Sequence, residues 1–343
     1  MNESVCHFSY TGCNLAKWWP PITTINGLIS FVLNGLTVAT ILRFRALRTA
    51  KEYTLILFLG IADTINGFAG AIGYAWRAYL SFTERSCECA TPLLCISLPY
   101  NLMWRWCDFS QSGMLLAISA DRLLAVYFPI YYFKCARRYA VKLSGFVYFY
   151  ATINLLLAWI YPIQNRHLKI PLICWPTHLG QRYYEYCKYV SSIQALLSVL
   201  LYAAVWRKFR HTLANRVYCI GRRESTFDER QNLRESRLTV TLGISSICTI
   251  FLDVIPRSLG IYWIFKPPTL TVAGLSPGDI LFQMDKWNAN MNFFIYAIRH
   301  REIRIGLKSL LTGQSLPDQL DRWTEDKSKN RWTDDKSKTG TEF

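Results

Sequence analysis

The chain has 343 residues, of which 51% are hydrophobic and 18% are charged. It is too apolar for a typical soluble domain of this length. Its formal net charge of +16 would suit a soluble nucleic-acid binder. The basic residues border long apolar blocks, however, where anionic lipid headgroups attract them. We therefore expect a membrane protein with no nucleic-acid partner.

Seven segments have the length and apolarity of membrane-spanning helices, which need about 20 residues each. They are residues 19–42, 54–76, 94–128, 141–163, 189–206, 238–265 and 280–298. The pattern predicts an all-α membrane protein, a seven-transmembrane helix bundle over residues 19–298. Residues 299–311 are typical of a short amphipathic eighth helix along the inner membrane face. Residues 1–18 precede the bundle, and residues 312–343 form a charged tail.

The distribution of Lys and Arg sets the expected orientation. Residues 1–18 contain a single Lys or Arg, whereas four follow the first span: Arg43, Arg45, Arg48 and Lys51. We expect a multi-pass protein of the plasma membrane with an extracellular N-terminus. Residues 1–17 lack an apolar core, so the first span is expected to act as the insertion signal. The sequence Asn2-Glu3-Ser4 is a candidate glycosylation site.

Polar residues interrupt the predicted spans at definite places. Asn34 in the first span and Asp63 in the second lie at mid-membrane depth, where they need each other, water or an ion. At the end of the third span, Asp121 and Arg122 form a charged pair, and Pro129 follows seven residues after the arginine. Such a pair either has a functional task or merely caps and anchors the helix.

The last two spans each carry a polar or helix-bending landmark. Pro256 removes a backbone hydrogen bond from the sixth span and is expected to bend it. The seventh span ends with Asn292-Phe293-Phe294-Ile295-Tyr296. With the segment Leu59-Gly60-Ile61-Ala62-Asp63 and the Asp121-Arg122 pair, these features resemble the signatures of rhodopsin-like G-protein-coupled receptors.

Three positions depart from the usual pattern of that family. Leu123 replaces the tyrosine of Asp-Arg-Tyr, Val254 replaces a tryptophan ahead of Pro256, and Phe293 replaces the proline of Asn-Pro-x-x-Tyr. Together with a cysteine-bearing first outer loop, these departures look like the nematode serpentine chemoreceptors, a diverged branch. The likeness spans roughly residues 34–308.

The resemblance implies a receptor that passes an extracellular signal to a heterotrimeric G protein, with a chemosensory or orphan role and no cofactor. Arg122 would pair with Asp121 and, when the sixth helix swings inward, with Glu235. Outward movement would free Arg122 for the G protein. Pro256, Asn292 and Tyr296 would take part in activation.

The resemblance also directs attention to the outer half of the bundle for the ligand, a small molecule or a peptide. Eighteen residues before Arg122 stands Trp104, where receptors for biogenic amines carry an aspartate, so an aminergic ligand is disfavoured. The candidate pocket residues are Trp104, Arg105, Asp108, Asp253, Asp285 and Lys286. A purely structural salt bridge among these charges is the alternative interpretation.

Lys286 supports a second hypothesis, an opsin-like photoreceptor. It stands six residues before Asn292, the position at which opsins attach retinal through a Schiff base. Val254 and the adjacent Asp285 argue against an opsin. A visible absorbance band formed with 11-cis-retinal and removed by Lys286→Ala would identify one.

The resemblance implies a disulfide between Cys95 and Cys174, with Cys87, Cys89 and Cys187 as competing partners. A metal site at Cys87 and Cys89 is disfavoured because no histidine cluster accompanies them. The histidines are scattered along the sequence and indicate no catalytic or metal-binding set, which argues against an enzyme.

The predicted tail contains a near-duplicate, residues 321–329 and 330–338, whose composition favours disorder. Its Ser and Thr residues are candidate phosphorylation sites for arrestin binding, although a neutral duplication explains them equally well. A seven-helix transporter or channel is the remaining alternative. The inverted repeats and broken paired helices typical of transporters are not evident in the sequence.

Overall fold

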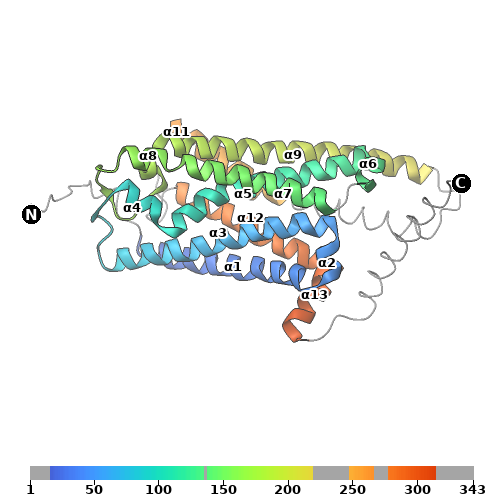
Figure 1. The fold of residues 1–343 in the computed structure, drawn as a ribbon, viewed down its shortest axis with the longest axis horizontal. Coiled ribbons are helices and arrows are strands. Elements are labelled where there is room, and N and C mark those ends of the chain that lie inside the picture. Colours follow the sequence, from blue (N-terminus) through green and yellow to red (C-terminus); the bar gives the residue numbers. More distant parts are fainter. Residues whose placement is uncertain (1–15, 135–136, 219–246, 266–276, 314–343) are drawn as a thin grey trace, which may run out of the picture.

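The computed structural model describes residues 16–134, 137–218, 247–265 and 277–313. Long helices run side by side along the longest axis of the molecule (Figure 1). They are α1 (Trp19–Arg43), α3 (Lys51–Phe82), α5 (Pro99–Tyr127), α7 (Arg137–Leu157), α9 (Gln181–Tyr218), the π-helical η3 (Ile250–Val254) continued by α11 (Ile255–Phe265), and α12 (Pro277–Arg299). Each of these long helices overlaps a predicted span.

Short elements connect the long helices at the two ends of the bundle. One end, which we call the disulfide end, carries β1 (Cys89–Ala90), α4 (Pro92–Ser97), α8 (Ile160–Gln164), β2 (Ile170–Pro171) and η2 (Pro176–Leu179). The opposite end, which we call the Arg122 end, carries α2 (Arg45–Thr49), α6 (Pro129–Lys134) and α13 (Arg301–Thr312). The strands β1 and β2 pair antiparallel, with Ala90 opposite Ile170.

Lipid-facing character is visible on the outside of the bundle. Within the described residues, four helical segments are long and apolar enough to cross a membrane: Trp19–Arg43, Lys51–Phe82, Arg137–Gln164 and Gln181–Lys208. Large apolar side chains are exposed along α1 and α7, among them Ile25, Val32, Phe146, Phe149 and Leu156. Many exposed apolar side chains of this size are unfavourable in water and are accommodated by lipid tails.

The third predicted span, residues 94–128, is not one continuous helix. It is divided into α4 and α5, and Leu98 between them is extended, with φ −65° and ψ 126°. The following residue is Pro99, whose ring disfavours helical geometry at the residue before it. Cys95 therefore lies on the separate helix α4 rather than at the top of the third span.

The sixth helix is irregular at the predicted proline. Pro256 lacks the N–H that would bond to the carbonyl of Leu252. The backbone directly before it, Ile250–Val254, forms a π-helical turn that leads into α11. Asp253 belongs to this turn and is buried, with 1% of its surface exposed.

The contact between α1 and α3 depends on glycine. A Cβ atom added at Gly27 would lie 2.5 Å from the backbone nitrogen of Ala71, and one added at Gly67 would lie 2.5 Å from that of Phe31. Both neighbours are backbone atoms, so the helices would have to separate to admit even a methyl group.

We expect Gly27→Ala to destabilise the folded protein by about 1–3 kcal/mol, the usual cost of overpacking. The measurement is the thermal unfolding of the purified protein. Gly145→Ala on α7 is the matched control, because a Cβ there meets no atom within 4 Å. Equal unfolding temperatures for the two variants would contradict close packing of α1 against α3.

Candidate functional site

The charged pair Asp121 and Arg122 lies at the Arg122 end of α5. Both residues are buried, with 2% and 6% of their surfaces exposed. Arg122 Nε donates to Asp121 Oδ2 at 3.0 Å, and a terminal guanidinium nitrogen makes a shorter contact with the same oxygen. A buried guanidinium and carboxylate need such direct pairing to offset their desolvation.

Tyr132 of α6 forms hydrogen bonds with both residues of this pair. Its hydroxyl accepts from an Arg122 terminal nitrogen at 2.6 Å and donates to Asp121 Oδ2 at 3.1 Å. Burial raises the pKa of the Tyr132 hydroxyl above its ordinary value, so the hydroxyl keeps the proton that it donates. Pro129, the proline noted in the sequence, begins the short helix that brings Tyr132 back to the pair.

Lys51, at the start of α3, holds Tyr132 from its other side. Its ammonium nitrogen donates to the Tyr132 carbonyl oxygen at 2.7 Å and lies 3.3 Å from the centroid of the tyrosine ring. We call Lys51, Asp121, Arg122 and Tyr132 the Arg122 cluster. Sequence reasoning missed Lys51 and Tyr132, and the aromatic pair Tyr131-Tyr132 after Pro129 was the only available hint. Glu235, the other predicted partner of Arg122, lies outside the described residues.

A polar network crosses the middle of the bundle. Asp63 Oδ1 on α3 accepts from Gln111 Nε2 on α5 at 2.6 Å, and Gln111 Oε1 accepts from Asn66 Nδ2 at 2.9 Å. Lys286 on α12 donates to Asn66 Oδ1. The network therefore joins three helices through side chains alone.

Asn34, the other predicted mid-membrane residue, donates to the carbonyl oxygen of Ser30 on its own helix at 3.0 Å. Asn34 and Asp63 are thus each satisfied by separate hydrogen bonds. Neither Asn66 nor Gln111 was singled out in the sequence, because a lone amide on an apolar helix carries no charge pattern.

A cavity of about 10 Å³ adjoins this network, roughly the space that one water needs. Its polar lining comes from α3, α5, the η3–α11 helix and α12: Asp63, Gln111, Ser112, Asp253, Arg257, Asn288 and Asn292. The predicted activation residue Asn292 therefore faces the same space as Asp63. Tyr296, one turn further along α12, is 4% exposed and packs in an apolar cluster with Ile41, Tyr53 and Ile303.

The charges predicted to line a ligand pocket are paired mainly with near neighbours. Arg105 forms an ion pair with Asp108 at 3.1 Å, one helical turn away, and Asp253 pairs with Arg257 in the same way. These pairs are structural salt bridges of the kind left open as the alternative interpretation, because residues three or four positions apart on a helix face each other. The side chain of Asp285 is not described.

Trp104 has an aromatic environment at the disulfide end. Its ring lies edge-on to Tyr74 and Tyr100, with centroid distances of 5.8 and 5.4 Å. The guanidinium carbon of Arg77, which the sequence analysis did not single out, lies 5.0 Å from the Trp104 ring. The predicted pocket residue Trp104 is thus placed in an aromatic cluster.

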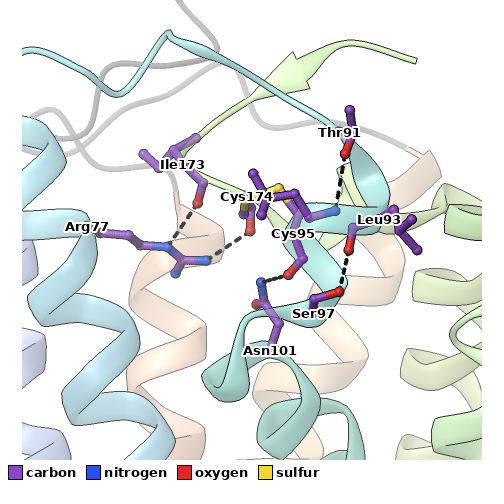
Figure 2. The surroundings of a disulfide bond; sticks show 9 residues. Arg77, Thr91, Leu93, Cys95, Ser97, Asn101, Ile173 and Cys174 are labelled. Atoms are coloured by element: carbon purple, nitrogen blue, oxygen red, sulfur yellow. Dashed lines mark hydrogen bonds between the residues drawn. A yellow bond between two sulfur atoms is a disulfide. The ribbon is translucent and has the colours of Figure 1, made fainter. Parts of the chain in front are cut away.

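The disulfide between Cys95 and Cys174 is present, as the family resemblance implied. It ties α4 to the segment that follows β2 (Figure 2). Of the competing cysteines, Cys87 and Cys187 are free thiols, and Cys89 takes part in another disulfide. Thr91 caps α4 by accepting from the N–H of Leu94 at 3.2 Å, and Asn101 Nδ2 donates to the Cys95 carbonyl at 2.7 Å.

A helical bundle with lipid-facing surfaces, a polar interior and a disulfide across one end is the architecture of a seven-transmembrane receptor. The family model described as serpentine type 7TM GPCR chemoreceptor Srsx matches residues 27–311. The chain therefore belongs to this nematode-type family of chemoreceptors. It is a multi-pass membrane receptor and not an enzyme, and the resemblance read from its motifs is confirmed. A search of curated proteins finds no match.

Proposed function

We propose that this chemoreceptor transmits the binding of an extracellular ligand at the disulfide end to a heterotrimeric G protein at the Arg122 end. It would lie in the plasma membrane with its N-terminus outside, and it would need no cofactor. The observation that carries the proposal is the Arg122 cluster, in which a buried guanidinium is held by a carboxylate and by a hydroxyl from a separate short helix.

The cluster has the properties of a two-state element. Arg122 carries five N–H donors. In this arrangement its Nε and one terminal nitrogen donate to Asp121 and Tyr132. If α6 moves away, Tyr132 leaves and the guanidinium regains free donors for the carbonyl or carboxylate oxygens of a partner. A hydrogen bond to a charged group contributes about 1.5–3 kcal/mol, enough to shift such an equilibrium by tenfold or more.

We expect Tyr132→Phe to raise ligand-independent G-protein activation by about tenfold or more. The variant loses the hydroxyl that holds Arg122 but keeps the ring over which Lys51 lies. Nucleotide exchange on a reconstituted heterotrimer, normalised to folded receptor, measures the change. Tyr131→Phe is the matched control, because Tyr131 is 62% exposed. Activation at or below the wild-type level would contradict a restraining role for Tyr132.

The proposed orientation has a separate test. The excess of Lys and Arg after the first span supports an extracellular N-terminus. An epitope tag at the N-terminus should therefore be stained in unpermeabilised cells, whereas a C-terminal tag should require permeabilisation. Arrestin binding to the charged tail remains a proposal that rests on composition alone, and the tail lies outside the described residues.

A further inference from the structure

The disulfide end contains a buried arginine that the coupling mechanism does not use. Four arginines are buried in the part of the chain that the structure describes: Arg77, Arg105, Arg122 and Arg257. Three of them form ion pairs, with Asp108, Asp121 and Asp253 respectively. Arg77 has no carboxylate partner among the described residues. An uncompensated buried charge is costly, so the surroundings of Arg77 require an explanation.

Arg77 is 2% exposed, near the end of α3. Its guanidinium carbon lies 5.1, 5.0 and 4.7 Å from the ring centroids of Tyr74, Trp104 and Trp175. Its side chain points toward the segment after β2 (Figure 2), where Nε donates to the Ile173 carbonyl at 3.4 Å and a terminal nitrogen donates to the Cys174 carbonyl at 3.3 Å. Both acceptors are neutral, and both bonds are longer than the usual 2.9–3.0 Å.

A second hydrogen-bond donor lies close to this arginine without a partner. Tyr100 packs against Trp104, is 2% exposed, and its hydroxyl makes no hydrogen bond within the described residues. The rings of Tyr100 and Trp104 can approach α3 closely because residue 73 is glycine. A Cβ atom at Gly73 would lie 2.7 Å from the Trp104 ring. Buried hydroxyls normally find a partner, so the Tyr100 hydroxyl is suited to donate to an acceptor on a ligand.

The surroundings therefore combine a guanidinium, a free phenolic donor and three aromatic rings, with no acid of the described chain among them. An isolated ammonium ligand would be repelled here. A carboxylate would suit the site, because guanidinium and carboxylate groups pair through two parallel charge-assisted bonds that are stronger than bonds to neutral carbonyls. Aromatic faces would pack against an apolar ligand body.

His178 on η2 does not alter this charge balance. Burial, and next the charge of Arg77, lower the pKa of the His178 imidazole, so it stays neutral near pH 7. Arg77 is therefore the one positive charge among these described groups, which would suit an anion of low charge.

We propose that Arg77, Tyr100 and the rings of Tyr74, Trp104 and Trp175 form the recognition site for an organic anion, a ligand with a carboxylate head and an apolar body. The inference rests on the proposed receptor function and names the chemical class of its ligand. On binding, the flexible Arg77 side chain turns from the Ile173 and Cys174 carbonyls to the carboxylate, and the Tyr100 hydroxyl donates to the same group. The disulfide keeps the segment over the site in place.

The test uses purified full-length receptor in lipid nanodiscs and measures its thermal unfolding with added probes. The probes are octanoate, 4-phenylbutanoate and indole-3-propionate, each beside its primary amide of nearly equal size. We expect at least one acid to stabilise the receptor at a concentration about tenfold or more below that of its amide, because only the acid pairs with the guanidinium. Equal effects of acids and amides, or no stabilisation by any acid, would overturn the proposal.

Variants assign the effect to the site. Arg77→Met should remove the preference for the acid, and Arg77→Lys, which keeps the charge but loses the planar fork, should weaken it. Tyr100→Phe should raise the half-maximal acid concentration several-fold without changing that of the amide. Arg85→Met is the matched control, because Arg85 is an exposed arginine paired with Glu88 at the same end. If Arg77→Met does not fold, Arg77→Lys and Tyr100→Phe decide the question.

An acid preference that survives both Arg77→Lys and Tyr100→Phe would show that Arg77 is only a clamp on the neighbouring segment. The assay contains no G protein, so its failure is distinct from failure of the proposed coupling. A receptor that binds acids but activates no G protein would retain this site while refuting the proposed function.

Discussion

Arg122→Ala is expected to reduce G-protein activation by at least about a hundredfold per folded receptor, because two or more charge-assisted hydrogen bonds to the partner would be lost, each worth about 1.5–3 kcal/mol. The measurement is nucleotide exchange on a reconstituted heterotrimer, normalised to surface receptor. Asp121 keeps the hydrogen bond from Tyr132 at 3.1 Å, and the normalisation to surface receptor separates the loss of coupling from any loss of stability caused by the unpaired carboxylate.

Asp121→Asn provides the sharpest comparison for this prediction. It weakens the hold on Arg122 but leaves the guanidinium in place. Ligand-independent activation should therefore rise in Asp121→Asn, whereas Arg122→Ala should abolish activation. Opposite signs for two adjacent residues would separate a coupling role from simple capping of α5. If the pair only anchors the helix end, both variants lose stability and keep normal activation per folded receptor.

Loss of the disulfide is expected to have the second large effect. Cys174→Ser should lower the stability of the receptor by about 2–5 kcal/mol, the usual range for a native disulfide. Cys95 and Cys174 are 79 residues apart in the sequence, so the bond closes a long loop that includes all of α5 and α7. The measurement is thermal unfolding of the purified receptor.

Two controls define the cause of this change. Cys87→Ser removes a free thiol from the same end and should leave the unfolding temperature nearly unchanged. A reducing agent should bring the wild-type receptor toward the unfolding temperature of Cys174→Ser. The prediction fails if Cys174→Ser and Cys87→Ser unfold at the same temperature.

Much of the helical layout was predictable because it depends on local properties. Runs of apolar residues set the spans, and the described helices α1, α3, α7, α9 and α12 lie where these runs occur. The break at Leu98 was missed, although Pro99 indicates it, because a hydropathy pattern carries no information on backbone angles. The partners of Cys95 were ambiguous for a related reason, since several cysteines share one side of the membrane.

The interior contacts were predicted less well. Arg105 and Asp108 are three residues apart in the sequence, so a salt bridge between them could be considered from the sequence, and this salt bridge is present. Gln111, by contrast, meets Asp63 across a separation of 48 residues, and Arg77 meets the Cys174 carbonyl across 97. Polar uncharged side chains and backbone carbonyls leave no pattern in a single sequence that identifies such distant partners.

The sequence by itself determined that this protein is a helical membrane receptor of a recognisable family, because span length, apolarity and motif spacing are properties of consecutive residues. Only the tertiary structure decided which groups surround the buried charges. Arg122 is held by Tyr132 from a separate short helix, and Arg77 by rings and carbonyls rather than by an acid. The physical reason is that a buried charge must find compensation within a few ångströms, and helix packing determines what lies there.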